Sequence, residues 1–132
     1  MVKYLTYDMI LTIHDQQVER DGGITGVRDI NLLKSAVEQI QQNVFGQELY
    51  PSLSDKVARL GFCIARNHVF NDANKRTSLA SMLVMLRLNK IALNSKYINS
   101  VDCLQFMVDL AAGKKSEADV VEWIENKLIL SD

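Results

Sequence analysis

The stretch HVFNDANKR, residues 68–76, together with the apolar run at residues 79–88, is the most informative part of this chain. The run after Asn74 holds strong helix formers and no breaker, so it predicts a buried helix over about residues 74–89. Asn74 is a good N-cap residue, which places residues 68–73 in a loop. The sequence therefore predicts a dense polar loop at the N-terminus of a core helix.

Helical periodicity extends outward from this stretch in both directions. Polar residues of the kind that cap helix N-termini predict six helices, which begin at or just after Thr6, Asp29, Ser54, Asn74, Ser100 and Ser116. Three glycines between residues 22 and 26 predict a loop, and residues 45–51 predict a loop or a short hairpin. No stretch shows sustained alternation, so β content should be small. We expect residues 1–132 to form one compact all-α domain, a bundle of about six helices.

Composition narrows the class of protein. Apolar residues make up 48% of the chain and there is one proline, which argues against disorder. The 15 basic and 16 acidic residues give a net charge of −1, so we expect no broad basic surface for direct nucleic-acid binding.

The cysteines and the apolar runs indicate the compartment. Cys63 and Cys103 lack metal-type spacing and are typical of buried thiols in a reducing compartment. No leader pattern is present, and the longest apolar run is too short for a membrane span. We expect a soluble, cytoplasmic protein.

The polar loop carries residue types suited to chemistry on an anion. His68 is the residue type that most often serves as a general base near neutral pH. Asp72 is a hard oxygen ligand of the kind that holds Mg²⁺ beside substrate phosphates. Lys75 and Arg76 place two cations in the first helical turn, where each costs roughly 0.3–1 kcal/mol unless an anion binds there. We also expect Arg66, at the end of the preceding helix, to reach the same phosphates. We expect a nucleotide phosphate chain at this position.

Taken singly, each of these residues can be explained by a purely structural role. A lone histidine is often a core residue, and a Lys-Arg pair is often a solvated surface feature. Their combination at a helix N-terminus favours the catalytic reading. A zinc site formed by His68, Asp72 and His14 is the weaker alternative, since the chain has two histidines and no nearby cysteine. The pair of His14 with Asp15 is more simply a surface or half-buried pair.

The motif resembles that of the Fic/Doc superfamily, whose general form is His-x-Phe-x-Asp/Glu-Gly-Asn-Gly/Lys-Arg. Residues 71–76, Asn-Asp-Ala-Asn-Lys-Arg, are most similar to the death-on-curing (Doc) branch of toxins. Residues 22–26, and Arg28-Asp29 followed by residues 32–36, look like the N-terminal signature of that branch. The resemblance covers most of the chain.

This resemblance implies a compact six-helix fold that transfers part of a nucleotide to a protein hydroxyl. His68 would be the catalytic base, and Asp72 would hold Mg²⁺. The phosphates would be bound by Asn74, Lys75, Arg76 and Arg66. Doc-type proteins resemble kinases that transfer the terminal phosphate of ATP to a threonine of elongation factor Tu and so arrest translation. The alternatives are AMP transfer, as in most Fic proteins, and a catalytically idle binding module.

Two departures from the wider Fic motif bear on this choice. Ala73 and Lys75 replace its two glycines, which restricts close backbone approach and adds a charge, and both changes support the kinase reading. The self-inhibitory pattern Ser/Thr-x-x-x-Glu-Gly/Asn is approached at residues 121–126, but Val121 stands where a hydroxyl residue is required. Family resemblance therefore suggests inhibition in trans, by an antitoxin whose disordered segment folds as a helix on this domain.

Overall fold

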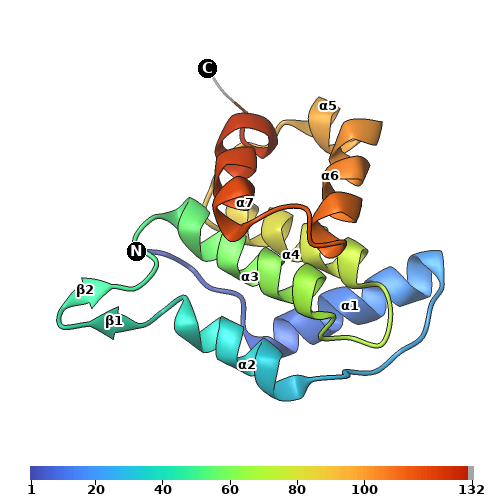
Figure 1. The fold of residues 1–132 in the computed structure, drawn as a ribbon, viewed down its shortest axis with the longest axis horizontal. Helices are drawn as coiled ribbons and strands as arrows, with labels where there is room; N and C mark the ends of the chain where they lie inside the picture. The colour runs from blue at the N-terminus through green and yellow to red at the C-terminus, as the bar shows by residue number, and fades with distance from the viewer. Residues whose placement is uncertain (131–132) are drawn as a thin grey trace.

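The structure, a computed structural model, describes residues 1–130, which form seven α-helices, one π-helical turn and a short hairpin (Figure 1). The elements are α1 (Tyr7–Asp21), α2 (Ile30–Gln39), β1 (Asn43–Val44), β2 (Gln47–Glu48), α3 (Leu53–Asn67), α4 (Asn74–Leu88), α5 (Ser95–Ile98), α6 (Val101–Ala111), α7 (Glu117–Trp123) and η1 (Ile124–Leu128). The prediction of an all-α fold with little β structure is confirmed.

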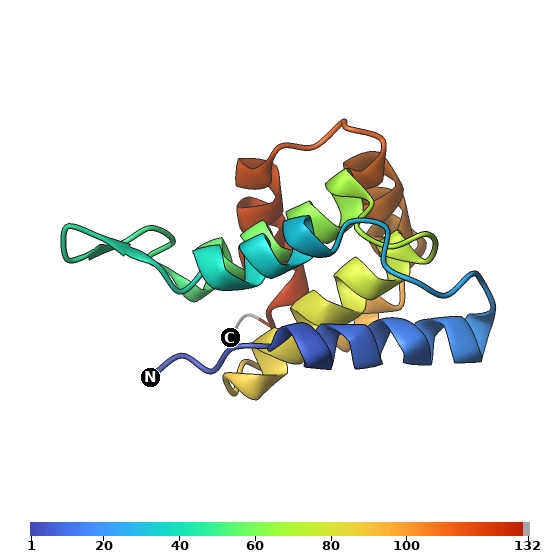
Figure 2. The same cartoon turned by 90° about the horizontal axis from the view of Figure 1, so that it is seen from below.

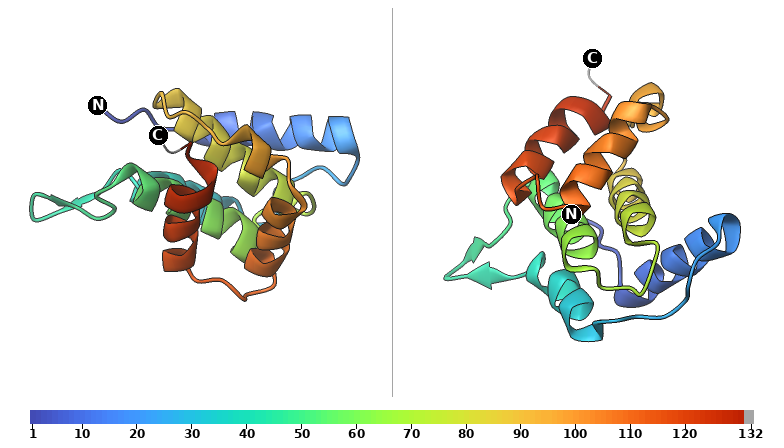
Figure 3. Two further views of the ribbon diagram at one scale, coloured as in Figure 1. Left: turned by 90° about the horizontal axis from the view of Figure 1, so that it is seen from above. Right: turned by 45° about the vertical axis from the view of Figure 1, so that its right-hand side comes forward.

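Helix α3 lies at the centre of the molecule. It packs against α4, α2, α6 and α7, with α1 and α2 on one side and α6 and α7 on the other (Figures 1 and 3). Leu60 and Ile64 of α3 and Met82, Met85 and Leu86 of α4 are fully buried between these layers. The predicted core helix after residue 74 is thus one half of the central α3–α4 pair, and the polar loop at residues 68–73 joins the two halves.

Short polar side chains set several helix N-termini as expected. The Thr6 side chain accepts a hydrogen bond from the Met9 backbone N–H, and the Asp29 carboxylate accepts one from the Leu32 N–H. Ser116 and Asp119 form the predicted capping box. These caps are local interactions, which is why the sequence located them.

Other boundaries differ from the prediction. The third helix is opened by Ser52, which forms a capping box with Asp55, while Ser54 is buried inside the first turn. Ser52 and Ser54, two residues apart, both offered a cap, and the position of Asp55 three residues after Ser52 decides between them. The polar link near residue 95 contains the short helix α5, capped by the Asn94 side chain.

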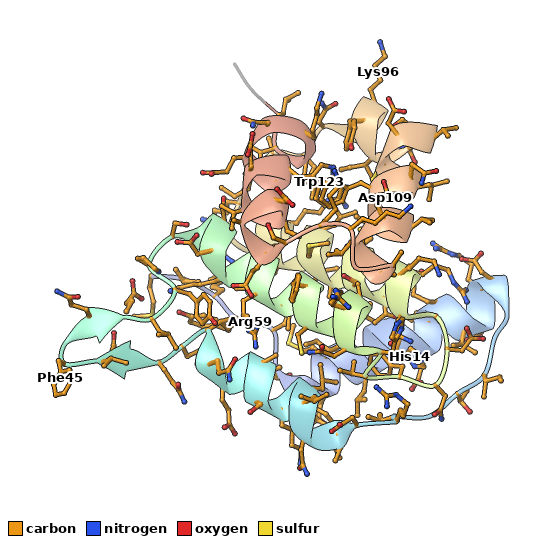
Figure 4. The ribbon with its side chains drawn as sticks, in the orientation of Figure 1. His14, Phe45, Arg59, Lys96, Asp109 and Trp123 are labelled. Carbon is orange, nitrogen blue, oxygen red and sulfur yellow. The ribbon has the colours of Figure 1, made fainter. Side chains whose placement is uncertain are left out.

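The hairpin β1–β2 projects from the body of the molecule (Figure 2). Its turn is Phe45-Gly46, both with positive φ, and the Phe45 side chain is fully exposed at the tip (Figure 4). Beneath the hairpin, the buried Lys56 amine donates to the Tyr50 carbonyl and pairs with the Glu48 carboxylate at 3.2 Å. The base of the hairpin is therefore anchored to α3 while its tip is free of the core.

The two cysteines match the expectation of buried, unpaired thiols. Both are free, and burial raises the pKa of Cys63 and raises that of Cys103 to about 11. A thiol with a raised pKa is mostly protonated at neutral pH and is a poor nucleophile. Among the helices described, none is long and apolar enough to cross a membrane.

Candidate active site

The loop between α3 and α4 is shaped by two residues with left-handed backbone conformations. His68 ends α3 with φ 49° and ψ 58°, and Ala73 precedes α4 with φ 62° and ψ 28°. Between them, Val69 and Phe70 are buried and hold the loop on the core. His68 and residues 71–76 line a pocket of about 410 Å³. The structure thus brings together His68, Asp72 and the cationic first turn of α4.

The Asp72 carboxylate is oriented by the backbone. Its Oδ1 accepts a hydrogen bond from the Ala73 N–H at 2.8 Å, and its Oδ2 accepts one from the Ile24 N–H at 3.1 Å. These two bonds, with smaller contributions from Arg76 and Lys75, lower the pKa of Asp72 below its ordinary value. The carboxylate is therefore ionised at neutral pH, with lone pairs left over for a cation.

The two cations of the first turn have different surroundings. Lys75 is exposed and makes no hydrogen bond or ion pair with any residue in the range 1–130. Arg76 donates to the carbonyls of Gln17 and Gly22, each at 2.9 Å, and its Nη1 lies 3.7 Å from an Asp21 carboxylate oxygen. Arg76 thereby ties α4 to the end of α1, and Lys75 is the more available cation.

Asn74 does not cap α4, contrary to the prediction. It is the first residue of the helix, and its side-chain amide forms two hydrogen bonds with Phe70: Oδ1 accepts from the Phe70 N–H at 2.9 Å, and Nδ2 donates to the Phe70 carbonyl at 3.0 Å. The residue at the cap position is Ala73, so no side chain caps α4. The first N–H groups of the helix consequently remain open to the pocket.

The remaining predicted residues, His68 and Arg66, lie near the loop in different ways. The His68 ring is exposed at the pocket and makes no hydrogen bond within the described residues, while its carbonyl accepts from the Arg28 guanidinium at 2.6 Å. Arg66 is also exposed, but it does not line the pocket. Its guanidinium lies against Gly113, where an added Cβ would be 3.1 Å from Cζ. In this conformation the Arg66 side chain lies outside the pocket.

The segment from Gly22 to Asp29 supports the loop directly, which the sequence analysis did not predict. The Val69 carbonyl accepts from the N–H groups of Arg28 and Asp29, and the Asn71 N–H donates to the Gly26 carbonyl at 3.1 Å. At Gly26, with φ 109°, an added Cβ would lie 2.7 Å from Asn71 Nδ2. The three closely spaced glycines were the available signal, because glycine allows such close backbone approach.

His14 was expected in a surface or half-buried pair with Asp15. The two side chains do lie together, with His14 Nδ1 3.8 Å from Asp15 Oδ1, and Asp15 is exposed, but His14 is more deeply buried than expected. The His14 ring, labelled in Figure 4, stacks on Phe70, and its Nε2 lies 2.9 Å from the Asp72 carbonyl oxygen. Within residues 1–130, no three His, Cys, Asp or Glu side chains are grouped so that they could hold a metal ion. The alternative of a zinc site at His68, Asp72 and His14 therefore has no support.

The sequence that forms this site matches a known family. Residues 4–86 match the model of the Fic/DOC family, so the chain belongs to that family. Two similar proteins carry Doc names. The chain is 34% identical over 121 residues to "Toxin Doc" of Mycolicibacterium smegmatis, covering 92% of this chain and 89% of that protein. It is 29% identical over 121 residues to "Protein kinase doc" of Escherichia phage P1, covering 92% of both chains.

Proposed function

We propose that this protein is a Doc-type toxin kinase that transfers the terminal phosphate of ATP to a threonine hydroxyl of elongation factor Tu and thereby arrests translation. The observation that carries the proposal is the pocket at the N-terminus of α4, where His68, Asp72 and the free Lys75 converge. The similarity to a protein named as a kinase, over nearly the whole chain, supports the same reaction class.

The phosphate chain would bind where α4 begins. The uncapped N–H groups and the helix dipole favour an anion there, and the Lys75 ammonium adds a mobile charge. Arg76 is held by α1 and would contribute its remaining donors, while Arg66 would join by changing rotamer. Both side-chain polar atoms of Asn74 are engaged with Phe70, so Asn74 would act through its backbone N–H and by shaping the loop.

Asp72 fits the role of a Mg²⁺ ligand. It is an ionised carboxylate on the pocket wall, and Mg²⁺ is commonly held by one or two carboxylates plus substrate phosphates. A bound Mg²⁺ would neutralise charge on the phosphate oxygens during transfer. The hydrogen bonds from the N–H groups of Ala73 and Ile24 fix the direction of the carboxylate.

In the proposed phosphate transfer, each side chain has one role. The neutral His68 ring takes the proton of the attacking threonine hydroxyl, whose oxygen then forms a bond to the terminal phosphorus of ATP. The bond from that phosphorus to the bridging oxygen breaks, and ADP leaves. Lys75 and the N–H groups of α4 stabilise the charge on the transferring phosphate. The exposure of the His68 ring leaves it accessible to a protein substrate.

The runner-up reaction is AMP transfer to a protein hydroxyl. Its support is the family match, since the same pocket could accept the phosphate chain in the opposite direction. Against it, Ala73 stands where the general Fic motif has a glycine, and it holds a backbone conformation that glycine adopts more easily. Lys75 takes the lysine rather than the glycine of the motif's Gly/Lys position and so adds a charge at the phosphate site. A catalytically idle binding module would not need the free Lys75 and the oriented Asp72 carboxylate in one pocket.

A toxin of this kind requires control by a partner. Glu125, the nearest counterpart of a self-inhibitory glutamate, lines a different pocket from His68, together with Val121 and Asn126. We propose inhibition in trans by an antitoxin that binds through a helix. The Doc name of the relative from Mycolicibacterium smegmatis supports a toxin of this type.

Intact-mass measurement of elongation factor Tu, after incubation with the protein and Mg·ATP, tests the function. We expect the addition of one phosphate, absent with His68→Ala. Addition of one AMP would replace the kinase by the transferase. If elongation factor Tu stays unmodified while a lysate protein gains label from terminally labelled ATP, the substrate is wrong but the reaction stands. No labelled protein in either experiment would favour the idle module.

A further inference from the structure

We infer that His14 is a positioning residue, which holds the peptide unit between Asp72 and Ala73 in one orientation by donating its Nε2–H to the Asp72 carbonyl. The part of this inference that concerns catalysis rests on the proposed function. The part that concerns the loop geometry stands without it.

The hydrogen bond from His14 defines the protonation of its ring. Nε2 lies 2.9 Å from the Asp72 carbonyl oxygen, and a carbonyl oxygen can only accept. Nε2 must therefore carry a proton. The ring also stacks on Phe70, with centroids 3.9 Å apart and planes 6° apart, and only 1% of the residue is exposed. The imidazole is thus fixed from α1 against the underside of the loop.

The same peptide unit is held from its other end. The Ala73 N–H donates to Asp72 Oδ1 at 2.8 Å, so both the carbonyl and the N–H of this peptide are engaged. Ala73 has φ 62°, a conformation disfavoured by its Cβ, and no side chain caps the helix behind it. Glycine would adopt this conformation more easily than alanine. The two hydrogen bonds offset the cost of alanine here, because rotation of the Asp72–Ala73 peptide plane would break both of them.

Loss of the His14 donor would act on Asp72. If the peptide rotates, the Ala73 N–H no longer faces Oδ1, and the carboxylate keeps only the bond from Ile24. Its direction into the pocket is then less defined. His14 touches no reacting group, so its effect on catalysis would be indirect.

Two substitutions separate the hydrogen bond from the stacking. His14→Phe retains a flat ring against Phe70 but has no donor, and His14→Gln retains an N–H donor without the ring. Asp15→Asn is the matched control, since Asp15 is exposed and neighbours the other ring nitrogen, with Oδ1 3.8 Å from His14 Nδ1. Circular dichroism of each variant reports the helical fold.

The first readout is nuclear magnetic resonance of the wild-type imidazole nitrogens, without ligand. We expect a protonated Nε2 on His14. The second is amide hydrogen exchange of Ala73 and Ile24, whose N–H groups bond the Asp72 carboxylate. We expect His14→Phe to speed both by about tenfold or more, His14→Gln to restore slower exchange, and Asp15→Asn to match wild type.

Two results would overturn the inference: an unprotonated Nε2 in the wild type, or unchanged Ala73 and Ile24 exchange in a folded His14→Phe variant. If His14→Phe does not fold, the wild-type protonation state decides. Phosphate transfer distinguishes the two proposals. Wild-type protein that transfers no phosphate but shows the expected exchange contradicts the proposed function alone. Normal transfer and normal exchange in His14→Phe contradict the inference alone.

Discussion

Lys75 and Arg76 are adjacent cations with different roles. Arg76 is bonded to the end of α1, whereas Lys75 has no partner among residues 1–130. A cation in the first turn of a helix opposes the helix dipole, so its placement makes physical sense when an anion binds there. At the residue scale, Lys75 is therefore the side chain whose removal should separate binding and catalysis from folding.

Lys75→Ala should reduce phosphate transfer by roughly 100–1000-fold, the loss expected when one charged donor to the transition state is removed. The melting temperature should not fall, because within residues 1–130 the side chain has no hydrogen bond or ion pair to lose. Lys96→Ala, on the exposed surface of α5 (Figure 4), is the control and should transfer as wild type. Equal activity of both variants would argue against the anion site at α4.

Asp72 should contribute stability that depends on pH. Its pKa is lowered in the folded state, chiefly by the hydrogen bond from the Ala73 N–H and then by that from Ile24. The folded state therefore binds fewer protons than the unfolded state, and the contribution is present above the ordinary carboxyl pKa and lost as pH falls through the lowered value. The advantage of wild type over Asp72→Asn, from urea unfolding, should be largest near neutrality and shrink below about pH 4. A constant difference across that range would contradict this assignment.

At the scale of elements, the α3–α4 pair determines where the loop sits, and one glycine permits its close approach. Gly61 is buried inside α3, facing α4, and its carbonyl accepts from the Ser78 hydroxyl at 2.7 Å. A Cβ at Gly61 would lie 2.2 Å from Met82 Sδ and 2.6 Å from its Cγ. The central pair can pack this closely because a side chain is absent at one position.

Gly61→Ala should destabilise the protein, although alanine is the better helix former by about 1 kcal/mol. Overpacking against the buried Met82 should outweigh that gain and leave a net cost of roughly 1–3 kcal/mol, measured by urea unfolding. The double variant Gly61→Ala/Met82→Ala should cost less than the sum of its parts, since the smaller side chain makes room for the new methyl group. A stabilised Gly61→Ala variant would show that α3 and α4 separate at little cost.

At the scale of the whole molecule, Arg59, labelled in Figure 4, forms hydrogen bonds that connect three helices. From α3, its guanidinium donates to Gln39 of α2 at 3.2 Å and to Glu117 of α7 at 2.9 Å. This half-buried contact joins the layer that carries the hairpin to the layer that carries the C-terminal helices. It supports a single cooperative unit around the central helix.

Arg59→Met keeps much of the aliphatic stem and removes both hydrogen bonds, so it should cost about 1–3 kcal/mol of unfolding free energy. Asp109→Asn is the control: within residues 1–130 the Asp109 carboxylate accepts a hydrogen bond only from Gln105 on the same helix, so the change should alter stability by less than about 0.5 kcal/mol. Urea unfolding should be followed both by circular dichroism and by fluorescence of Trp123, the one tryptophan of the chain. The two transitions should coincide in wild type, and separate transitions would contradict one cooperative unit.

Local chemistry made much of the protein predictable from its sequence. The caps at Thr6, Asp29 and Ser116, the core helix after the motif, and the gathering of His68, Asp72 and Lys75 all depend on residues close together in the chain. Interactions of that kind leave a pattern at fixed spacing, and the pattern can be recognised without knowing how helices pack.

Only the tertiary structure decided what holds the motif in place. Its supports come from residues some 40–60 positions earlier: Ile24 and Arg28 in the glycine-rich segment, and His14 on α1. The amide of Asn74 was predicted to cap a helix and instead bonds Phe70, because the left-handed turn at Ala73 directs it back to the loop. The spacing of residues in the sequence identifies side chains suited to the chemistry. Contacts between distant segments depend on how the helices pack, and a local sequence pattern carries no information about that packing.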